Sequence, residues 1–430
     1  MSTVNTATEE LNLMVCRMAE TLQGSSILRI ANEIKDKKKQ GFEIYNLTIG
    51  DFDSKIYPIP HELEEEIDRS YKDGNTTYPN PQGNPEYREA IANYIKKYEK
   101  LDYSPSEFLI AGGARALVYA TYRTILDEGD GVIYPVPSWN NNHYTHLANS
   151  KGFVIETKAK NNFMPTAEEI APYIGEANLI SLCSPQNPTG TVFSREGMED
   201  VCNLILEENA KRAGKRKPVY MMLDQIYWML TYGEYEHYNP FSINPEMRNY
   251  TVFIDGLSKT FCATGLRAGW AFGPLQLINK MKSIISHIGA FTATAEQVGI
   301  SNYLNRSEDV ESHIRSVKDR LYASLAGFYK EFMSLKNDGY PVDAIEPQAA
   351  MYLTVKLDLL GKKDANGKTI ETTDDITSFL IDEAKIGLIP FTAFGSEINP
   401  TWFRLSVGTC SADEVPAIMS NLKTALAKLS

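Results

Sequence analysis

The sequence of 430 residues is long enough for two or three domains with a large hydrophobic core. Its 43% hydrophobic and 23% charged residues are typical of a soluble globular protein, and a formal net charge of −12 disfavours nucleic acid or an anionic membrane as the main partner. The polar, acidic N-terminus resembles neither a secretory signal nor a transit peptide, and no apolar run approaches the roughly 20 residues of a membrane helix, so we expect a cytoplasmic protein.

Cysteine and histidine do not predict a metal centre. The five cysteines include no CxxC pair and are expected to be free thiols in a reducing compartment. The six histidines are scattered and form no HExxH motif, so we expect no metal ion in the functional site.

Two turns in the first fifth of the chain carry candidate ligand contacts. A strand-like run over 44–49 ends at Gly50, where the backbone is expected to approach another group closely. An amphipathic helix is predicted over 61–71, followed by a stiff loop over 78–83 that is dense in turn-forming residues. Tyr78 in this loop is either a packed corner or a ligand contact, and the loop alone favours the corner.

A glycine turn follows the next predicted strand. The strand over 108–111 runs into Gly112, Gly113 and Ala114, where a helix begins. The free N–H groups and the positive end of the helix dipole would meet there, which predicts an anion site. The alternative is that the glycines serve only the packing of the turn.

Two further strands end in rigid loops. The strand over 131–134 leads to Trp139, which follows two prolines and would either stack on a flat cofactor ring or lie in the core. The strand over 179–183 leads to the loop 184–190, whose prolines fix Asn187 in place.

A carboxylate ends the most apolar of the predicted strands. The run over 219–223 is continuous enough for a parallel strand covered on both faces, and it is followed by Asp224 and Tyr227. A carboxylate at the tip of a buried strand is costly without a cationic partner. Asp224 is therefore either a helix N-cap or the partner of a cation such as a protonated pyridinium nitrogen.

Lysine and arginine follow the strand over 251–254. Lys259 would be partly removed from water, which lowers the pKa of its amine and makes it nucleophilic. Arg267 would grip a phosphate with two parallel hydrogen bonds. The pair suggests a pyridoxal phosphate site with Lys259 as the Schiff base, whereas the alternative is a solvated loop lysine beside a surface arginine.

The elements as a whole predict an α/β fold. Strands and helices alternate from about residue 105 to 275, which indicates a doubly wound, mainly parallel sheet whose carboxyl edge carries the candidate residues. Further strands are predicted over 349–355, 386–390 and 402–407 in a smaller α+β domain; Arg404 on the last is either solvated or a carboxylate fork. The expected parts are an N-terminal arm with part of the small domain (1–50), a large cofactor-binding domain (51–305) and a C-terminal small domain (306–430).

Six motifs occur in a fixed order: GGARAL, PVPSW, SPQNPTG, DQIY, GLSKTFCATGLRAG and WFRLS. With them, and over nearly its whole length, the chain resembles the fold-type I aminotransferases of class I/II, of the aspartate and aromatic kind. The resemblance implies pyridoxal 5′-phosphate as cofactor and a homodimer with active sites at the subunit interface. The implied cofactor-binding residues are Gly113, Ala114, Trp139, Asn187, Asp224, Tyr227, Ser258, Lys259, Arg267 and, from a second subunit, Tyr78.

The resemblance also implies a role for the catalytic residues. Lys259 would carry the cofactor as an internal aldimine and then move a proton from the substrate Cα as general base and acid. Asp224 would keep the pyridine nitrogen protonated, while Tyr227 and Asn187 would bond the phenolic oxygen. The implied ligands of the substrate α-carboxylate are Gly50, Asn187 and Arg404.

The sequence departs from the family pattern in three places. Gly256 stands where many members have a phosphate-contacting serine, so Ser258 would have to replace it. His143 lies one position further from the tryptophan than the corresponding histidine. The arginine with which these enzymes bind a distal carboxylate of the substrate is not found. Thr292 and Thr294 lie roughly where it would fall. Arg115 is either a substitute for it or a helix-surface residue.

The expected activity is the transfer of an amino group between an L-amino acid and a 2-oxo acid, with 2-oxoglutarate as one oxo acid. The nearest alternative is a lyase or synthase on the same scaffold, such as a C–S lyase or an aminocyclopropane carboxylate synthase-like enzyme. A regulator that senses the cofactor without turnover is a third class. Such regulators carry a DNA-binding helix-turn-helix ahead of this domain, and the stretch before the first motif is not basic.

Overall fold

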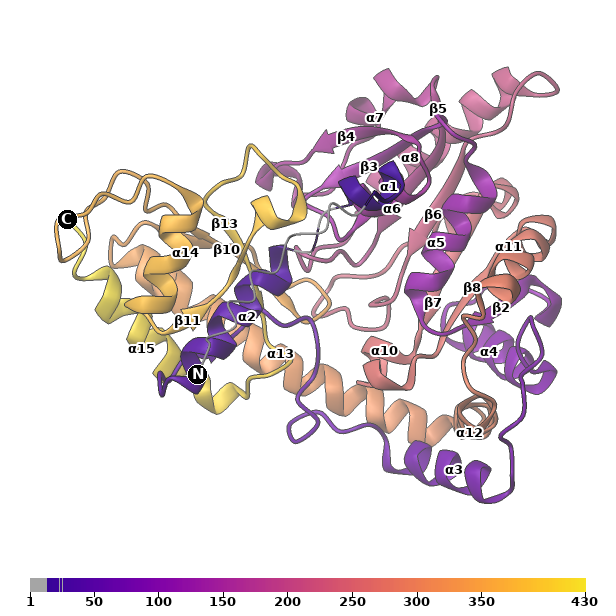
Figure 1. The fold of residues 1–430 in the computed structure, drawn as a ribbon, viewed down its shortest axis with the longest axis horizontal. Helices are drawn as coiled ribbons and strands as arrows, with labels where there is room; N and C mark the ends of the chain where they lie inside the picture. The colour runs from indigo at the N-terminus through magenta and orange to yellow at the C-terminus, as the bar shows by residue number, and fades with distance from the viewer. Residues whose placement is uncertain (1–13, 23, 25) are drawn as a thin grey trace, which may run out of the picture.

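The computed structural model describes residues 14–22, 24 and 26–430. Figure 1 shows two lobes, one built on a seven-stranded sheet and the other on a four-stranded sheet, with the long helix α13 (Ser307–Asn337) reaching from one to the other. The first 13 residues of the expected N-terminal arm lie outside the described part of the chain, which begins with the short helix α1 (Arg17–Thr21) and α2 (Ser26–Lys39).

The large sheet confirms the expected α/β architecture. Its strand order is β2-β8-β7-β6-β5-β3-β4; β4, β3, β5, β6 and β7 are parallel to one another, and β8 is antiparallel to both β7 and β2. The strands span β2 Phe108–Ala111, β3 Gly131–Val136, β4 Lys151–Glu156, β5 Ala177–Cys183, β6 Tyr220–Asp224, β7 Thr251–Gly256 and β8 Gly269–Phe272.

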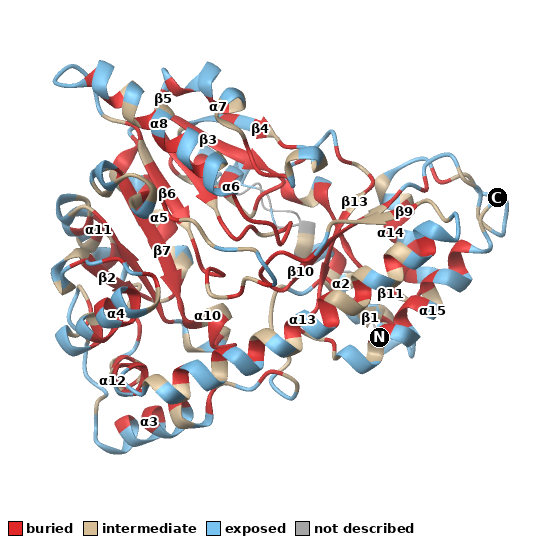
Figure 2. Ribbon diagram, turned by 180° about the vertical axis from the view of Figure 1, so that it is seen from behind, coloured by how far each residue is buried: buried red, intermediate tan, exposed pale blue. Residues whose placement is uncertain are grey.

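Helices cover both faces of this sheet, so β2, β3, β7 and β8 are buried along their whole length, whereas the edge strand β4 is partly exposed (Figure 2). Alternate residues of β7 illustrate the two layers, since Val252 and Ile254 belong to one hydrophobic cluster and Phe253 to the other. The first layer contains α5 (Ala114–Ile125), α6 (Asn141–Leu147) and α11 (Leu275–Ile288). The second contains α4 (Pro85–Tyr98), α7 (Ala167–Ile174), α8 (Arg195–Arg212) and α12 (Thr294–Leu304), with α3 (His61–Lys72) packed on α12.

The smaller lobe is antiparallel. Its sheet has the order β12-β13-β10-β9, with β9 Val342–Ala344, β10 Tyr352–Leu357, β12 Ile389–Pro390 and β13 Trp402–Ser406. A separate parallel pair joins β1 (Tyr45–Asn46) to β11 (Ile386–Gly387). The helices α14 (Thr373–Asp382), α15 (Val415–Leu426) and α13 complete the lobe.

Three expected strands differ from the observed ones. The run 44–49 pairs only at its first residues, as β1. The strand expected over 349–355 begins at Tyr352, because Ala350 has a φ of 61° and cannot continue an extended chain. The run 386–390 is two strands, since β11 pairs with β1 and β12 pairs with β13.

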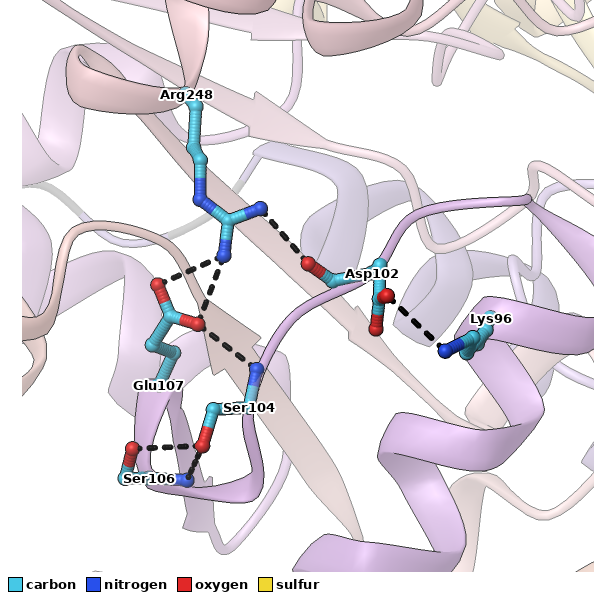
Figure 3. A network of polar contacts seen from close by, with 6 residues as sticks. All are labelled: Lys96, Asp102, Ser104, Ser106, Glu107 and Arg248. Carbon is cyan, nitrogen blue, oxygen red and sulfur yellow. Dashed lines mark hydrogen bonds and ion pairs between the residues drawn. The ribbon is translucent and has the colours of Figure 1, made fainter.

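A closed polar network ties the start of β2 to the segment before β7 (Figure 3). Arg248 Nη2 donates to the two carboxylate oxygens of Glu107 at 3.0 and 2.9 Å, and Arg248 Nη1 donates to the backbone oxygen of Asp102 at 2.8 Å. The same carboxylate accepts from the backbone N–H of Ser104 at 2.8 Å. We call Asp102, Ser104, Glu107 and Arg248 the Arg248 clamp.

None of the described helices combines the length and apolar character that crossing a bilayer requires.

Candidate active site

Asp224 lies at the carboxyl end of the large sheet. It is the last residue of β6 and stands in register between Cys183 of β5 and Ile254 of β7. Its Oδ1 accepts a hydrogen bond from the backbone N–H of Ile226 at 3.2 Å, and no described residue forms an ion pair with it. Because its surroundings exclude water, the pKa of Asp224 rises to about 6. The charge of Lys259 lowers the pKa of Asp224, but by less than burial raises it.

Lys259 reaches the same region from the short helix α10 (Leu257–Thr260), directly after β7. Its Nζ donates to the backbone oxygen of Gly50, and the ring of Tyr227 has its centroid 5.9 Å away. Desolvation lowers the pKa of the Lys259 amine to about 8. The amine is thus held in place and is partly unprotonated near neutral pH, as a nucleophile requires.

Arg404 is buried rather than solvated, with 2% of its surface exposed on β13. Its Nη1 donates to Asn187 Oδ1 at 2.8 Å and its Nη2 to the backbone oxygen of Thr48 at 2.6 Å. The guanidinium lies 4.6 Å from the ring centroid of Tyr352, and Nε has no hydrogen-bond partner among the described residues. Neutral groups fix its position and leave its charge unpaired, so it can bind a carboxylate.

The close backbone approach predicted at Gly50 is present. A Cβ at this position would lie 2.7 Å from the Tyr352 hydroxyl and 3.6 Å from Arg404 Nη1. Glycine therefore lets the turn pass between the lysine and the arginine, which are 145 positions apart in the sequence and meet only because this turn bridges the two lobes.

Tyr352 belongs to the site although its sequence context gives no signal for it. Its hydroxyl lies 2.7 Å from the hydroxyl of Tyr227, and burial raises the pKa of Tyr227 well above its ordinary value. Asp51 was also missed; it accepts from the Thr264 hydroxyl, and its charge raises the pKa of Lys259, against the effect of burial. Tyr352 stands in an apolar strand and Asp51 in a polar turn, where neither residue type is unusual.

An open anion cradle lies at the start of α5. Gly113 precedes the helix with a φ of 93° and provides no side-chain cap, so the first N–H groups of the helix, including that of Ala114, stay free of a capping side chain. A Cβ on Gly113 would lie 2.2 Å from Arg267 Nη2. Among the described residues, Arg267 donates only to the backbone oxygens of Thr264 and Gly112, at 2.7 and 3.3 Å. Helix end and guanidinium together fit a phosphate.

The structure explains why position 256 is not a serine. A Cβ on Gly256 would lie 2.7 Å from the backbone oxygen of Ala268 on the neighbouring segment and 3.0 Å from the Cα of Gly269. A side chain there would force β8 away from β7. Ser258 lies two residues further on, in α10 beside Lys259.

Trp139 and Arg115 lie together. The Arg115 guanidinium is 4.1 Å from the ring centroid of Trp139, and it has no hydrogen-bond or ion-pair partner among the residues that the structure describes. The hydroxyls of Thr292 and Thr294 already have hydrogen-bond acceptors: they donate to the backbone oxygens of Ala111 and Thr77, respectively. Of the three residues considered for a distal carboxylate, Arg115 alone has a free charge.

Two candidate residues are not brought to Lys259 by this chain. Tyr78 is 95% exposed and lines a surface cavity of about 550 Å³ with Tyr71, Pro79 and Ala295. His143 lies on α6, where burial lowers its pKa, and it makes no hydrogen bond to Asp224 within the described chain. The contribution of Tyr78 from a second subunit stays a prediction.

These residues fit pyridoxal 5′-phosphate. The half-buried Asp224 carboxylate forms no ion pair with a described residue, and a pyridinium nitrogen would provide one. The cradle at Gly113 is kept clear of a side chain, with a helix end and Arg267 facing it. Lys259 supplies the amine that an aldehyde requires.

Comparison with known proteins agrees with this geometry. Residues 43–422 match the family model for aminotransferase class I and II. An aspartate aminotransferase of Bacillus sp. (strain YM-2) is 30% identical over 399 residues, which are 92% of this chain and 95% of that protein. A probable aspartate/prephenate aminotransferase of Rickettsia felis is 28% identical and covers 95% of this chain and 96% of its own. The crystal structure of the aspartate aminotransferase from Rhizobium meliloti matches 97% of this chain and 100% of its own with a TM-score of 0.86 at 25% identity. The chain therefore belongs to the class I and II aminotransferases, transferases of fold type I that depend on pyridoxal 5′-phosphate.

Proposed function

We propose that this protein transfers the amino group of an L-amino acid to 2-oxoglutarate and that its cofactor is attached to Lys259 as a Schiff base. One observation carries the proposal. Lys259, Asp224 and Arg404 come from α10, β6 and β13 into one water-poor region, and none of them forms an ion pair with a described residue. Unpaired charges are costly there, and a charged cofactor with a zwitterionic substrate would neutralise them.

Proton transfer falls to Lys259 and Asp224. When bound, the cofactor supplies a ring that accepts the electrons released at the substrate Cα. Asp224 would hold the proton on the ring nitrogen, because an adjacent positive charge stabilises its otherwise desolvated carboxylate. Lys259 Nζ would remove the proton from Cα and return it during the reverse half-reaction. A pKa of about 8 suits both duties near neutral pH.

Arg404 and Asn187 would bind the substrate's α-carboxylate. The hydrogen bond of 2.8 Å between them fixes both side chains before substrate arrives, so little conformational entropy remains to be lost on binding. The carboxylate would accept from the guanidinium, whose Nε has no partner among the described residues. Tyr352 covers one face of the guanidinium and excludes water from it.

Arg115 supports a dicarboxylate such as 2-oxoglutarate. Its guanidinium rests on Trp139 and has no anionic partner within the described chain, so a second substrate carboxylate would supply one. Trp139 would stack on the cofactor with its other face. Replacing Arg115 with glutamine is expected to raise the KM for 2-oxoglutarate about tenfold and to leave the KM for pyruvate within about twofold. Equal effects on both oxo acids would contradict this role.

The active enzyme would be a homodimer in which Tyr78 completes the phosphate site of the other subunit. The exposure of Tyr78, at 95%, supports this, because a large aromatic ring is seldom left fully in water without a partner. Mixing Tyr78→Phe chains with Lys259→Ala chains tests it. Each mixed dimer would contain one site with both native residues, so activity above that of either parent is expected.

The proposed reaction is tested with a panel of amino acids and 2-oxoglutarate. Glutamate formed in step with the oxo acid of the donor is the expected result. Pyruvate and ammonia released from a cysteine-type donor, without glutamate, would overturn transfer in favour of elimination.

A further inference from the structure

The backbone around Asp51 is fixed to the small lobe on both sides. Before it, the hydroxyl of Ser406 donates to the backbone oxygen of Ile49 at 2.6 Å. After it, the backbone N–H of Asp53 donates to the backbone oxygen of Gly408 at 2.9 Å. Gly408 packs so closely on this turn that a Cβ there would lie 2.1 Å from the backbone oxygen of Asp51. The position of Asp51 is therefore set by the end of β13 and the residues that follow it.

The Asp51 side chain extends from this turn to the segment that carries Lys259 and Arg267. Its Oδ1 accepts a hydrogen bond from the hydroxyl of Thr264, and the backbone oxygen of Thr264 accepts from Arg267 Nη1 at 2.7 Å. The preceding residue, Gly50, accepts from Lys259 Nζ through its backbone oxygen. Two adjacent residues of the turn are thus bonded to the segment on which the amine and the guanidinium of the anion cradle lie.

The charge of Asp51 opposes those of two cations that act on the Lys259 amine. The charges of Arg115 and Arg404 lower the pKa of Lys259, whereas the charge of Asp51 raises it. No ion pair in the described part of the chain includes Asp51, so its charge acts across space rather than through a contact. Solvent ions screen such a charge only weakly in a region that is poor in water.

The other titratable groups around Lys259 do not supply this negative charge near neutral pH. Burial raises the pKa of the Cys262 thiol to about 12 and that of the Tyr227 hydroxyl well above its ordinary value, so both groups stay protonated. The carboxyl of Asp224 has a pKa of about 6, and its charge would be neutralised by the pyridinium nitrogen of the proposed site. Asp51 is therefore the carboxylate that is left to balance the two arginines before substrate arrives.

We propose that Asp51 is a positioning residue for Lys259, whose amine it provides with a counter-charge to the two arginines. The hydrogen bond from Thr264 keeps the carboxylate from turning away. When the carboxylates of the substrate neutralise the arginines, the charge of Asp51 remains and makes the amine more basic, as removal of the Cα proton requires. This role of Asp51 rests on the proposed function of Lys259 as Schiff base and proton carrier.

Absorbance titration of the holoenzyme tests this role, because the spectrum of the cofactor reports whether the Schiff-base nitrogen of Lys259 is protonated. Asp51→Asn keeps an acceptor for the Thr264 hydroxyl and removes the charge. Without that charge the protonated form is less stable, so the Schiff base of Asp51→Asn is expected to lose its proton at a pH about one unit or more below that of the native protein.

Two further variants separate the charge of Asp51 from its surroundings. Asp53→Asn is the matched control, since it makes the same change two positions further along the turn, where the carboxylate accepts from the backbone N–H of Lys55 at 2.9 Å. It is expected to titrate as the native protein does. Asp51→Glu keeps the charge and is expected to restore the native titration to within about half a pH unit.

The spectra and the site of attachment together decide the outcome. A native titration in Asp51→Asn, with the borohydride-trapped adduct still on Lys259, would overturn the role of Asp51 and leave the proposed amino transfer intact. An equal shift in Asp53→Asn would also overturn it, because net charge rather than position would then be the cause. Absence of the adduct from the native chain would overturn the proposed function itself, and the role of Asp51 with it. Should Asp51→Asn fail to fold, Asp51→Ser takes its place, with the same shift expected and the same contradiction if the titration stays native.

Discussion

The Arg248 clamp and the group around Arg404 use arginine in opposite ways. Arg248 is paired with a carboxylate through two hydrogen bonds, and that carboxylate also holds the backbone of Ser104 (Figure 3). Arg404 is more deeply buried, yet its partners are an amide side chain and a backbone oxygen. The clamp neutralises its own charge and holds structure together. The group around Arg404 keeps charges that pair with no described residue and that a charged ligand would neutralise.

The largest effect is expected at Lys259. Lys259→Ala removes the amine that we propose to hold the cofactor and to move the proton, so turnover is expected to fall by at least about 10⁴-fold. Steady-state glutamate formation measures the loss, and borohydride reduction followed by mass spectrometry locates the adduct on residue 259 of the native chain. Lys280→Ala, on the exposed side of α11, is the control and should keep full activity. Sustained turnover by Lys259→Ala would mean that Lys259 and the group around Arg404 do not form the active site, so the contrast with the Arg248 clamp would not be one of function.

Arg404→Leu is expected to have the next largest effect on activity. Because the variant loses the guanidinium that we propose to bind the α-carboxylate, we expect kcat/KM for amino acids to fall by an amount equivalent to about 2–5 kcal/mol of transition-state stabilisation. Steady-state kinetics with donors of different side chains checks whether the loss is uniform. If the KM for every donor stays native, Arg404 is a structural arginine like Arg248.

Asp224 is expected to destabilise the cofactor-free protein as pH rises. Its pKa is about 6 in the folded chain against 3.8 when exposed, so between these values the folded state binds more protons and loses stability with increasing pH. The loss relative to Asp224→Asn is about 3 kcal/mol between pH 3.5 and 7. Urea unfolding of both cofactor-free proteins across this range measures it. Parallel stability profiles would mean that Asp224 already has a partner.

Arg248→Met is expected to have the smallest and the purely structural effect. It leaves the Glu107 carboxylate without its arginine and should lower the free energy of unfolding by about 1–3 kcal/mol, with kcat/KM within about twofold of native. Lys96→Met is the matched control in the same network, since the exposed ion pair with Asp102 contributes less than about 1 kcal/mol. A change in kcat/KM larger than the change in stability would show that the clamp also shapes the active site.

The sequence pattern locates individual residues of the site wherever a strand ends abruptly in a charged or glycine residue. Asp224 and the turn at Gly113 stand out for this reason, because an apolar run defines the strand and a charged residue or glycine then breaks it. Lys259 follows shortly after Gly256, which ends β7. Where no charged residue interrupts the run, the predicted bounds of the strand were wrong. The runs over 349–355 and 386–390 contain no charged residue, so only the φ of Ala350 and the separate partners of β11 and β12 decide where each strand begins.

What the sequence alone determined is the local chemistry: an α/β order of elements, an amine after one strand, a carboxylate after another and an open helix start. Only the tertiary structure decided which of these groups meet. Gly50 carries the backbone between Lys259 and Arg404, Tyr352 closes the site over Tyr227, and a neighbouring backbone excludes a side chain at position 256. These contacts join segments far apart in the chain, and their cause is the packing of one lobe on the other, which no short stretch of sequence contains.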